Sequence, residues 1–374
     1  MGLIALLGVA MACGGSTGSS GASGDDGGAG DGGSSSGSSG SSSGSGSSSG
    51  ARSDGGSGSS SGGSSSSSSG GSSGGLAMTS AVTITVEPSD DAQGLITSIQ
   101  NAKTSVHMEM YLLSNSKVID ALISQHQAGH DVKVILNQNF PTTGSDSGSN
   151  SSVYTQLQNA GVAVIWAPAG FTYTHEKGVI IDGTSAWIMT MNATESSPSS
   201  NREYLALDTD PADVAEIEAI FQHDYANQGY HASGKLVVSP DNSRAELTTL
   251  IGMAKSNIDM EAEELSDSGI VSALVTAAGQ GVTVHIVVAD STTPSATALT
   301  SLKGAGVKLN VFSKYYVHAK SMVVDGKYAY VGSVNYTGGS IGYNREVGII
   351  TATASEVQKV ESTTTSDFAA GSPL

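Results

Sequence analysis

The sequence predicts an α/β protein of two tandem repeated halves, each an α-β-α sandwich around a mostly parallel sheet. Three observations lead to this prediction: β-type runs alternate with helix-type segments, the alternation occurs twice, and charged motifs recur at one constant offset along the chain. Strands that alternate with helices of this length are typical of sheets covered by helices on both faces. The repeat adds the expectation that the halves pack about a pseudo-twofold axis and share one active-site cleft.

The segment before residue 80 precedes this α/β region. Residues 1–13, MGLIALLGVAMAC, form an apolar run that ends at the only cysteine, Cys13. This start resembles a bacterial lipoprotein signal without its usual Lys or Arg, and the resemblance implies lipid attachment at Cys13; an incidental cysteine is the alternative. Residues 14–79 are almost entirely Gly and Ser, cannot bury apolar surface and are predicted to form a disordered tether. We therefore expect an extracytoplasmic protein of the bacterial cell envelope, lipid-anchored or secreted.

The charge balance bears on the partners of the α/β region. Of the 16 basic and 34 acidic residues, Arg52 and four aspartates lie before residue 80, which leaves 15 basic and 30 acidic residues. Long nucleic acids bind through many phosphate contacts, and a net charge of −15 opposes such contacts. A phosphate-binding site is therefore expected to be a local pocket, and nucleic acid is a disfavoured partner.

The first half is predicted over residues 80–229 and the second over residues 230–374. The expected elements of the first half are, in order, a strand over 82–86, a helix over 92–103, a strand over 106–112, a helix over 117–128, a strand over 132–136, a helix over 153–159 and a strand over 162–166. The first strand alternates in hydrophobicity, whereas the run 132–136 is continuous and therefore predicted to be buried. A hairpin and a further strand complete each half.

The hairpin of the second half carries the first chemical signal. Residues 318–335 read HAKSMVVDGKYAYVGSVN, in which SMVV and YAYV are two strands and Asp325-Gly326 makes the turn. Asp-Gly is a strong hairpin signal because Gly adopts positive φ without steric cost. His318 and Lys320 are two positions apart and so point to the same face of the strand. An imidazole beside an ammonium suits a phosphate better than a hydrophobic core.

The chemical residues of this hairpin have counterparts earlier in the chain, all at the same offset. His175, Lys177, Asp182 and Asn192 correspond to His318, Lys320, Asp325 and Asn335, and Asn201-Arg202-Glu203 corresponds to Asn344-Arg345-Glu346. A looser echo comes before them, since AKTSVHMEMYLLS from Ala102 parallels AKSNIDMEAEELS from Ala254. Such a constant register indicates a tandem duplication.

The pattern His-x-Lys-x4-Asp, present twice and followed by Gly-Ser-x-Asn at 332–335, resembles the phospholipase D superfamily. The resemblance extends over nearly all of residues 80–374. It implies chemistry on a phosphodiester bond. Because the superfamily includes phospholipases D, cardiolipin and phosphatidylserine synthases and nucleases, the resemblance indicates the chemistry more closely than the substrate.

The residue types fit this chemistry on their own. Phosphodiester cleavage without a metal needs a nucleophile, an acid for the leaving oxygen and cations for the phosphoryl oxygens. Two histidines can divide the first two tasks through a phosphohistidine, and by resemblance His175 is taken as nucleophile and His318 as acid and then base. Lys177 and Lys320 are assigned to the phosphoryl oxygens. The predicted hydrogen-bond donors to phosphate are Asn192, Asn335, Ser333 and Thr190. Carried over from the family, Glu203 and Glu346 are the carboxylates that orient the imidazoles. No cofactor and no metal are implied.

Two sets of assignments have structural alternatives. Asp182 and Asp325 belong to the motif and count among the catalytic candidates, yet both stand directly before Gly in a hairpin turn, and turn chemistry alone accounts for them. Met189-Thr190 takes the place of Gly332-Ser333, so the first half-site departs from the pattern where Gly would let the backbone approach phosphate.

Other charged residues receive no catalytic role. Arg202 and Arg345 are expected to pair with nearby acids. The acidic cluster Glu261, Glu263, Glu264 is a disfavoured candidate for contact with a cationic head group. The six histidines outside the motifs have no partner pattern, and we assign no metal site to them.

Three functional classes remain open. The first is a phospholipase D that hydrolyses phospholipids to phosphatidate and a head-group alcohol, which the predicted anchor and the acidic surface favour. The second is a cardiolipin synthase-like phosphatidyl transferase, and the third is an extracytoplasmic nuclease, which the negative charge disfavours. We expect a phospholipid substrate, a membrane reached through the lipid anchor, and a monomer, because both motifs lie in one chain.

Overall fold

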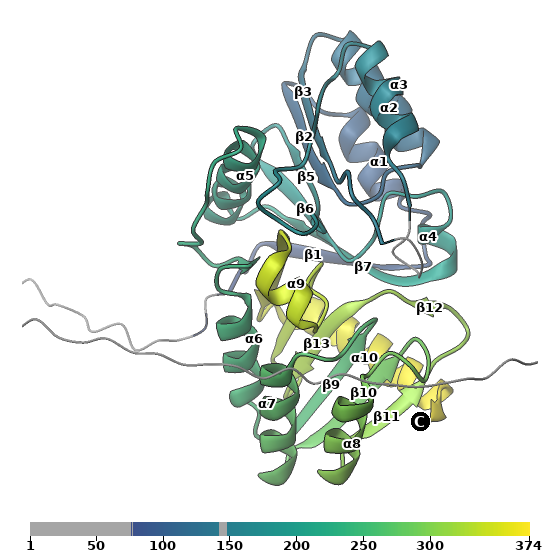
Figure 1. The fold of residues 1–374 in the computed structure, drawn as a ribbon, viewed down its shortest axis with the longest axis vertical. Coiled ribbons are helices and arrows are strands. Elements are labelled where there is room, and N and C mark those ends of the chain that lie inside the picture. Colours follow the sequence, from purple (N-terminus) through teal and green to yellow (C-terminus); the bar gives the residue numbers. More distant parts are fainter. Residues whose placement is uncertain (1–75, 77, 142–147) are drawn as a thin grey trace, which may run out of the picture. The chain divides into compact units, whose positions relative to one another are not determined.

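The computed structural model describes Leu76 and residues 78–141 and 148–374. The predicted signal with Cys13 and nearly all of the predicted tether lie outside these residues. Within the described ranges, no helix combines the length and the apolar character needed to cross a membrane. Figure 1 shows the first half of the α/β region in blue and teal and the second half in green and yellow.

The first half contains the predicted elements in the predicted order. They are β1 (Val82–Glu87), α1 (Gln93–Gln100), β2 (Ser105–Met110), α2 (Ser116–Gln127), β3 (Asp131–Leu136), α3 (Ser151–Asn159), β4 (Ala163–Trp166), β5 (Lys177–Ile181), β6 (Ser185–Met189), α4 (Ser197–Ser200), β7 (Asn201–Asp208) and α5 (Pro211–Tyr225). Helix α2 begins after Asn115, whose side chain accepts a hydrogen bond from the Val118 amide at 3.2 Å. Asn is a favoured N-cap because its side chain satisfies an amide that the helix leaves unpaired.

The second half repeats this series. It contains β8 (Val237–Ser239), α6 (Ser243–Gly252), β9 (Asn257–Ala262), α7 (Ser268–Gly279), β10 (Thr283–Val288), α8 (Ala296–Gly304), β11 (Lys308–Val311), β12 (Tyr316–Val317), β13 (Lys320–Val324), β14 (Tyr328–Gly332), α9 (Gly338–Tyr343), β15 (Glu346–Thr351), α10 (Ala354–Ala370) and β16 (Ser372–Pro373). Asp267 caps α7 through the amides of Gly269 and Ile270, as Asn115 caps α2. The duplication thus extends to the helix ends.

The predicted fold class is confirmed, with one correction to the sheets. The first sheet has the strand order β1-β7-β6-β5-β2-β3-β4, with β12 beside β7, and the second has the order β16-β11-β10-β9-β13-β14-β15-β8. Among the named strands of the described residues, the parallel pairs are those of the β2-β3-β4 and β9-β10-β11 segments and the short β12–β7 pair. The sheets are mixed rather than mostly parallel, because each hairpin strand pairs antiparallel with the strand beside it.

The hairpin turns form as the Asp-Gly pairs predict. In the first half, Asp182 and Gly183 have φ of 56° and 61°, and in the second Asp325 and Gly326 have φ of 54° and 61°. Two successive residues with positive φ match the right-handed twist of the strands that they join. The turns place β5 beside β6 and β13 beside β14, so both motifs lie on strands inside a sheet.

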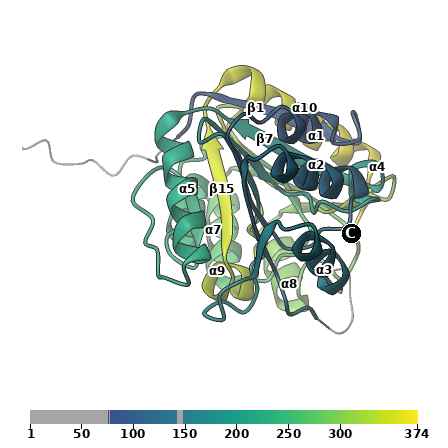
Figure 2. The same ribbon diagram turned by 90° about the horizontal axis from the view of Figure 1, so that it is seen from above.

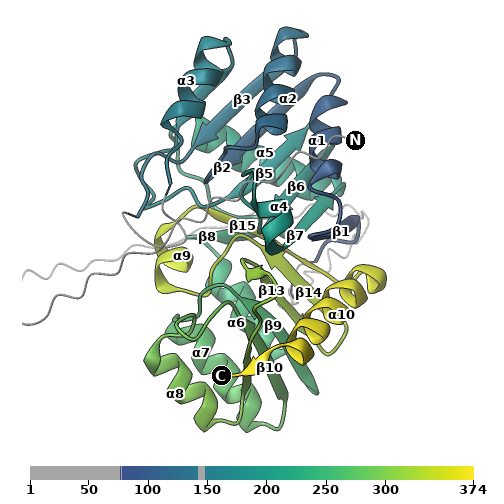
Figure 3. The same ribbon diagram turned by 90° about the vertical axis from the view of Figure 1, so that its right-hand side faces the viewer.

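The halves share a central core besides their own. Each sheet packs one face against its own helices, and α1 and α2 lie side by side on the first sheet (Figures 2 and 3). A third apolar cluster contains Ile220 of α5 and Val360 of α10. It also contains strand residues of both sheets, such as Ile188 and Val331. Burial of such side chains stabilises the joined halves as one unit.

Two buried ion pairs cross between the halves. Arg345 of the second half donates to Asp224 of α5 at 2.6 and 3.0 Å, and Arg202 of the first half donates to Asp367 of α10 at 2.5 and 3.2 Å. Asp224 and Asp367 are themselves counterparts in the register of the repeat. The expected pairing of both arginines with acids is confirmed, and each arginine takes its acid from the opposite half.

Candidate active site

Backbone pairing brings each histidine to the opposite half. Thr174, just before His175, pairs in parallel with Arg345, and the amide of His175 donates to the Arg345 carbonyl at 2.9 Å. In the same way β12, just before His318, pairs in parallel with the start of β7. Because parallel strands advance in step, the residue after each pair lies next to a glutamate of the other half.

His175 is held by Glu346 of the second half. The Nδ1 atom of His175 lies 3.0 and 2.9 Å from the two carboxylate oxygens of Glu346, and both side chains are buried. Burial alone would raise the pKa of Glu346, but the charge and hydrogen bond of His175, with Lys177 and Ser340, outweigh burial and lower it. Glu346 is therefore an ionised acceptor, and it also accepts from the Ser340 hydroxyl and from Asn344.

His318 is held by Glu203 of the first half in the same way. The Nδ1 atom of His318 lies 2.8 and 3.0 Å from the Glu203 carboxylate oxygens. Burial would raise the pKa of Glu203, but His318, Lys320 and Thr190 together lower it. The two glutamates thus lie where the sequence analysis placed them, next to imidazoles, and each serves the histidine of the other repeat.

These contacts assign the ring protons. An ionised carboxylate only accepts hydrogen bonds, so Nδ1 of each histidine carries a proton and, in the neutral ring, Nε2 carries the lone pair. The Nε2 atom of His175 is buried and has no hydrogen-bond partner among the described residues. The Nε2 atom of His318 instead lies 3.4 Å from Lys320 Nζ and 3.5 Å from a carboxylate oxygen of Glu263. Each ring therefore contacts a glutamate through Nδ1, and the two rings differ in the surroundings of Nε2.

The motif lysines are both buried beside their histidines. Lys177 Nζ donates to the His175 carbonyl at 2.7 Å, and Lys320 Nζ donates to the His318 carbonyl at 2.7 Å. Their other contacts differ, because Lys177 lies over the Tyr111 ring at 5.0 Å from its centre while Lys320 lies 2.5 Å from Glu263. The structure brings both ammonium groups to the site, each with a different neighbour.

The two predicted hydroxyl donors are directed elsewhere. Thr190 donates its proton to Glu203 at 2.5 Å, and Ser333 donates to the Val347 carbonyl at 3.3 Å. A hydroxyl has only one proton to donate, so the assignment of Thr190 and Ser333 to phosphate is corrected to the support of the glutamate-bearing strands. Asn192 and Asn335 would donate through Nδ2, and the Nδ2 atom of Asn335 donates to Glu263 at 3.3 Å in this structure; their assignment to phosphate stays a prediction.

The Gly332 position also has a different explanation from the one expected. A Cβ atom on Gly332 would lie 2.4 Å from the Gly348 Cα atom and 2.7 Å from the Tyr330 hydroxyl. The counterparts of Gly332 and Gly348 in the first half are Met189 and Leu205, which pair across β6 and β7 and belong to the core. The departure from the family pattern is therefore a change in core packing and not a loss of phosphate contact.

Asp182 and Asp325 are fold residues in this structure, which corrects their place among the catalytic candidates. Asp182 accepts hydrogen bonds from the amides of residues 103–105, and Asp325 accepts them from the amides of residues 255–257. Each carboxylate lies five positions beyond its lysine along the strand, or about 16 Å at ~3.3 Å per residue. Both aspartates fix the loop that enters the neighbouring strand, far from the imidazoles.

Two further residues contact the motifs: Tyr111, to which sequence reasoning gave no role, and Glu263, which it weighed only as a disfavoured contact for a cationic head group. The Tyr111 ring meets the His175 ring edge-on at 4.5 Å between centres. The Glu263 carboxylate touches Lys320, Asn335 and the Tyr316 hydroxyl. Their signal was present in the parallel between the segments from Ala102 and Ala254, which aligns Tyr111 with Glu263; in the structure both follow directly after a strand.

Two cavities border this centre, and Tyr316 lines both of them. One of about 440 Å³ is lined by Asn192 and His318 together with Leu112, Ser114, Thr194, Ser196, Ser197 and Asn201. The other, of about 510 Å³, reaches Glu263. Among the described residues, no group of three or more His, Cys, Asp or Glu side chains is arranged to hold a metal ion. The arrangement provides two imidazoles and two ammonium groups, and His318 lines the smaller of these two cavities.

Comparisons with known proteins agree with this geometry. A family model described as "Cardiolipin synthase, PLD-like domain" matches residues 95–225 and again residues 247–367. Cardiolipin synthase 2 of Bacillus cereus is 25% identical over 317 residues, which cover 72% of this chain and 60% of that protein. The chain therefore spans less than two thirds of the length of that relative.

Two solved structures share the fold. Phosphatidylserine synthase of Haemophilus influenzae matches with a TM-score of 0.61 and 13% identity, over 80% of this chain and 89% of that one. Polyphosphate kinase of Porphyromonas gingivalis also matches with a TM-score of 0.61 and 13% identity, over 75% of this chain and 46% of that one. At this identity the likeness concerns the fold alone.

Proposed function

We propose that this chain, which belongs to the phospholipase D-like domain family, transfers a phosphatidyl group from a phospholipid to the hydroxyl of an alcohol. Members of this family act on phosphodiester bonds. The observation that carries the proposal is the pair of reciprocal histidine–glutamate contacts. The Nε2 atom of His175 has no partner among the described residues, whereas the Nε2 atom of His318 lies beside a lysine and a carboxylate. This asymmetry suits a two-step displacement at phosphorus.

The two steps use the histidines in turn. In the first, Nε2 of His175 attacks phosphorus, the bond from phosphorus to the leaving oxygen breaks, and His318 gives its Nε2 proton to that oxygen. In the second, an alcohol oxygen attacks phosphorus, its proton passes to Nε2 of His318, and the electron pair of the phosphorus–nitrogen bond returns to His175. Lys177 stabilises the negative charge on the phosphoryl oxygens, while Lys320, the second cation of the site, also pairs with Glu263.

Transfer and hydrolysis differ only in the acceptor of the second step. Water in place of the alcohol gives phosphatidate, the product of the hydrolysis that the sequence analysis ranked first. The curated relatives named cardiolipin synthase support transfer instead, so we rank transfer above hydrolysis. Hydrolysis stays the second candidate, because the same two histidines serve either acceptor.

The full chain incubated with phosphatidylglycerol vesicles and EDTA in ¹⁸O-labelled water tests the proposal. We expect a lipid with two phosphatidyl groups, together with free glycerol, and no ¹⁸O in the lipid product, all measured by mass spectrometry. Phosphatidate that carries one ¹⁸O atom would identify a hydrolase. No change in the lipid, combined with cleavage of plasmid DNA in parallel, would reject both readings in favour of a nuclease.

We also propose that Cys13 carries a lipid that holds the enzyme at a membrane surface. The sequence signal supports this proposal, and Cys13 itself lies outside the described residues. The Cys13→Ser variant should move from the membrane fraction to the supernatant with unchanged activity on a dissolved diester. Retention of the variant in the membrane fraction would contradict the anchor.

A further inference from the structure

Tyr111 and Glu263 occupy equivalent places in the two halves. Tyr111 directly follows β2 and Glu263 directly follows β9. The Tyr111 amide donates to the Glu176 carbonyl at 3.0 Å, and the Glu263 amide donates to the Ala319 carbonyl at 3.2 Å, where Glu176 and Ala319 are themselves counterparts. Since the backbone is the same, the difference between the two half-sites lies in the side chain.

The Glu263 carboxylate contacts the side chains of the second half that the sequence predicts to act on phosphate. One of its oxygens, Oε2, lies 2.5 Å from Lys320 Nζ, 3.3 Å from Asn335 Nδ2 and 3.5 Å from His318 Nε2. Burial alone would raise the pKa of Glu263, but His318, Lys320 and His175 outweigh burial and lower it to about 2. An ionised carboxylate therefore lies where a phosphoryl oxygen would otherwise meet these three donors.

The first half-site carries a neutral ring at the corresponding place. There the Tyr111 ring faces His175 and Lys177. Like charges repel strongly in a buried site, so a phosphodiester is bound more favourably on the Lys177 side than beside Glu263. The duplicated site is thus divided into a phosphate side and a side with an acidic acceptor.

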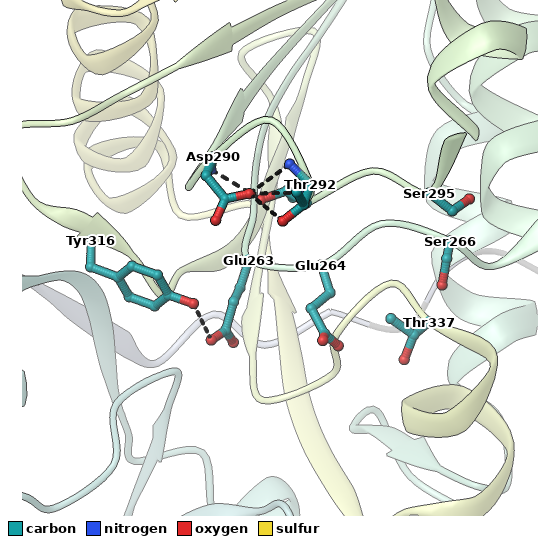
Figure 4. A pocket seen from close by; sticks show the side chains of 9 residues that line it. Glu263, Glu264, Ser266, Asp290, Thr292, Ser295, Tyr316 and Thr337 are labelled. Atoms are coloured by element: carbon teal, nitrogen blue, oxygen red, sulfur yellow. Dashed lines mark hydrogen bonds between the residues drawn. The ribbon is translucent and has the colours of Figure 1, made fainter. Parts of the chain in front are cut away.

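The cavity of about 510 Å³ opens on the acidic side. Figure 4 shows Glu263, Glu264 and Asp290 around it together with the side chains of Ser266, Thr292, Ser295, Tyr316 and Thr337. The Tyr316 hydroxyl donates to Glu263 Oε1 at 3.2 Å. A carboxylate has about four acceptor positions, so donation from Tyr316, Lys320 and Asn335 leaves Glu263 able to accept from one further hydroxyl when Nε2 of His318 carries no proton, as at the start of the second step.

We propose that Glu263 is the residue that positions the alcohol: it accepts a hydrogen bond from one hydroxyl in this cavity, so that a neighbouring hydroxyl of the same alcohol lies beside Nε2 of His318 and transfer to an alcohol is favoured over transfer to water. This inference rests on the proposed function, since it concerns the second step of the same reaction. In that step the alcohol oxygen bonds to phosphorus, its proton passes to His318 Nε2, and the bond from phosphorus to His175 breaks. The lining of carboxylates and hydroxyls suits an alcohol with several hydroxyls, such as glycerol or the glycerol head group of phosphatidylglycerol.

The Glu263→Gln variant of the full chain separates the two steps. The probe is p-nitrophenyl methyl phosphate with glycerol as acceptor, because p-nitrophenolate leaves with little need for a proton. We expect the burst of p-nitrophenolate to change by less than about threefold, whereas the ratio of glyceryl methyl phosphate to methyl phosphate falls about tenfold or more, as the loss of a hydrogen bond to a charged group implies. Glu263→Asp, which keeps the charge, should recover part of the ratio.

Glu361→Gln on α10 is the matched control, because Glu361 lies beside the hairpin turn at Gly326 and touches none of the site residues named above. It should leave both the burst and the ratio unchanged. An unchanged product ratio in Glu263→Gln, or an equal fall of the burst and of both products, would overturn the inference and leave the proposed function in place. A wild-type chain that turns over the p-nitrophenyl ester but no phospholipid would reject the proposed function and still let the ratio test Glu263.

Discussion

The crossed contacts predict that a glutamate of one repeat controls the chemistry of the other. The perturbation is Glu346→Gln, which keeps the size of the side chain and removes its charge. If His175 is the nucleophile, this change in the second half should block the first chemical step. Glu203→Gln, in the first half, should impair His318 instead and so spare the first step when the leaving group is good.

The size of the effect follows from the donors around Glu346. Its Oε1 atom accepts from the Ser340 hydroxyl and from Asn344, while Nδ1 of His175 lies 2.9 Å from Oε2. A glutamine amide would put its oxygen toward Ser340 and Asn344 and its NH2 group toward His175, which would move the ring proton to Nε2. A lost charge-assisted hydrogen bond is equivalent to about 10- to 100-fold in rate, and the wrong tautomer in a serine-protease triad costs about 10⁴-fold. We therefore expect a fall of about 10² to 10⁴ in the rate of the first step.

The assay is the burst of p-nitrophenolate from a p-nitrophenyl diester, followed by acid quench, digestion and mass spectrometry of the adduct. Glu346→Gln should lose the burst, whereas Glu203→Gln should keep it and accumulate the adduct on His175. Thermal unfolding of both variants serves as the control for folding. Adduct that accumulates on His175 in Glu346→Gln at the wild-type rate would refute the argument from crossed contacts.

Four further outcomes are expected. His318→Ala should release a burst from a p-nitrophenyl diester and then stall, whereas His175→Ala should give neither burst nor adduct; the opposite result would exchange their roles. Because the two motifs supply nucleophile, acid and cations, turnover should persist in excess EDTA, and activity that only an added divalent ion restores would contradict this mechanism. Asp224→Ala leaves Arg345 buried without its carboxylate and should lower the free energy of unfolding in urea by about 3–5 kcal/mol, and a loss below ~1 kcal/mol would contradict the buried pair. Burial raises the pKa of Glu261 to about 8, above an unfolded value of about 4.5, so its contribution to stability declines as pH rises between these values, by up to about 1.4 kcal/mol per pH unit; Glu261→Gln should make the free energy of unfolding in urea depend less steeply on pH between about pH 5 and 8, and an unchanged slope would count against the raised pKa.

Much of the fold could be predicted because each half is specified locally. The strand and helix patterns between residues 82 and 166 give each element to within one helical turn of its observed ends. The Asp-Gly turns fix both hairpins. The mixed character of the sheets was not predicted, because strand order depends on pairings between segments far apart in the chain, such as β1 with β7.

The sequence predicted which residues form the site but not which histidine each glutamate contacts. The constant register identifies His175, His318 and the two glutamates, yet the equal histidine-to-glutamate spacing in the two repeats says nothing about which half each glutamate serves. That choice depends on the parallel pairing of β12 with β7 and of Thr174 with Arg345, which is a tertiary contact. Glu263 was passed over for a related reason, since its importance depends on its distance to Lys320 and not on any motif.

The reciprocal contacts have the form of an isologous interface, in which residue i of one unit meets residue j of the other and j meets i. A homodimer built on this plan must carry the same residue at both copies of every position. Here the two units are covalently joined, so each position can diverge alone while the contacts that need both units are kept. The tyrosine and the carboxylate at the equivalent positions Tyr111 and Glu263 are a difference that a homodimer cannot hold.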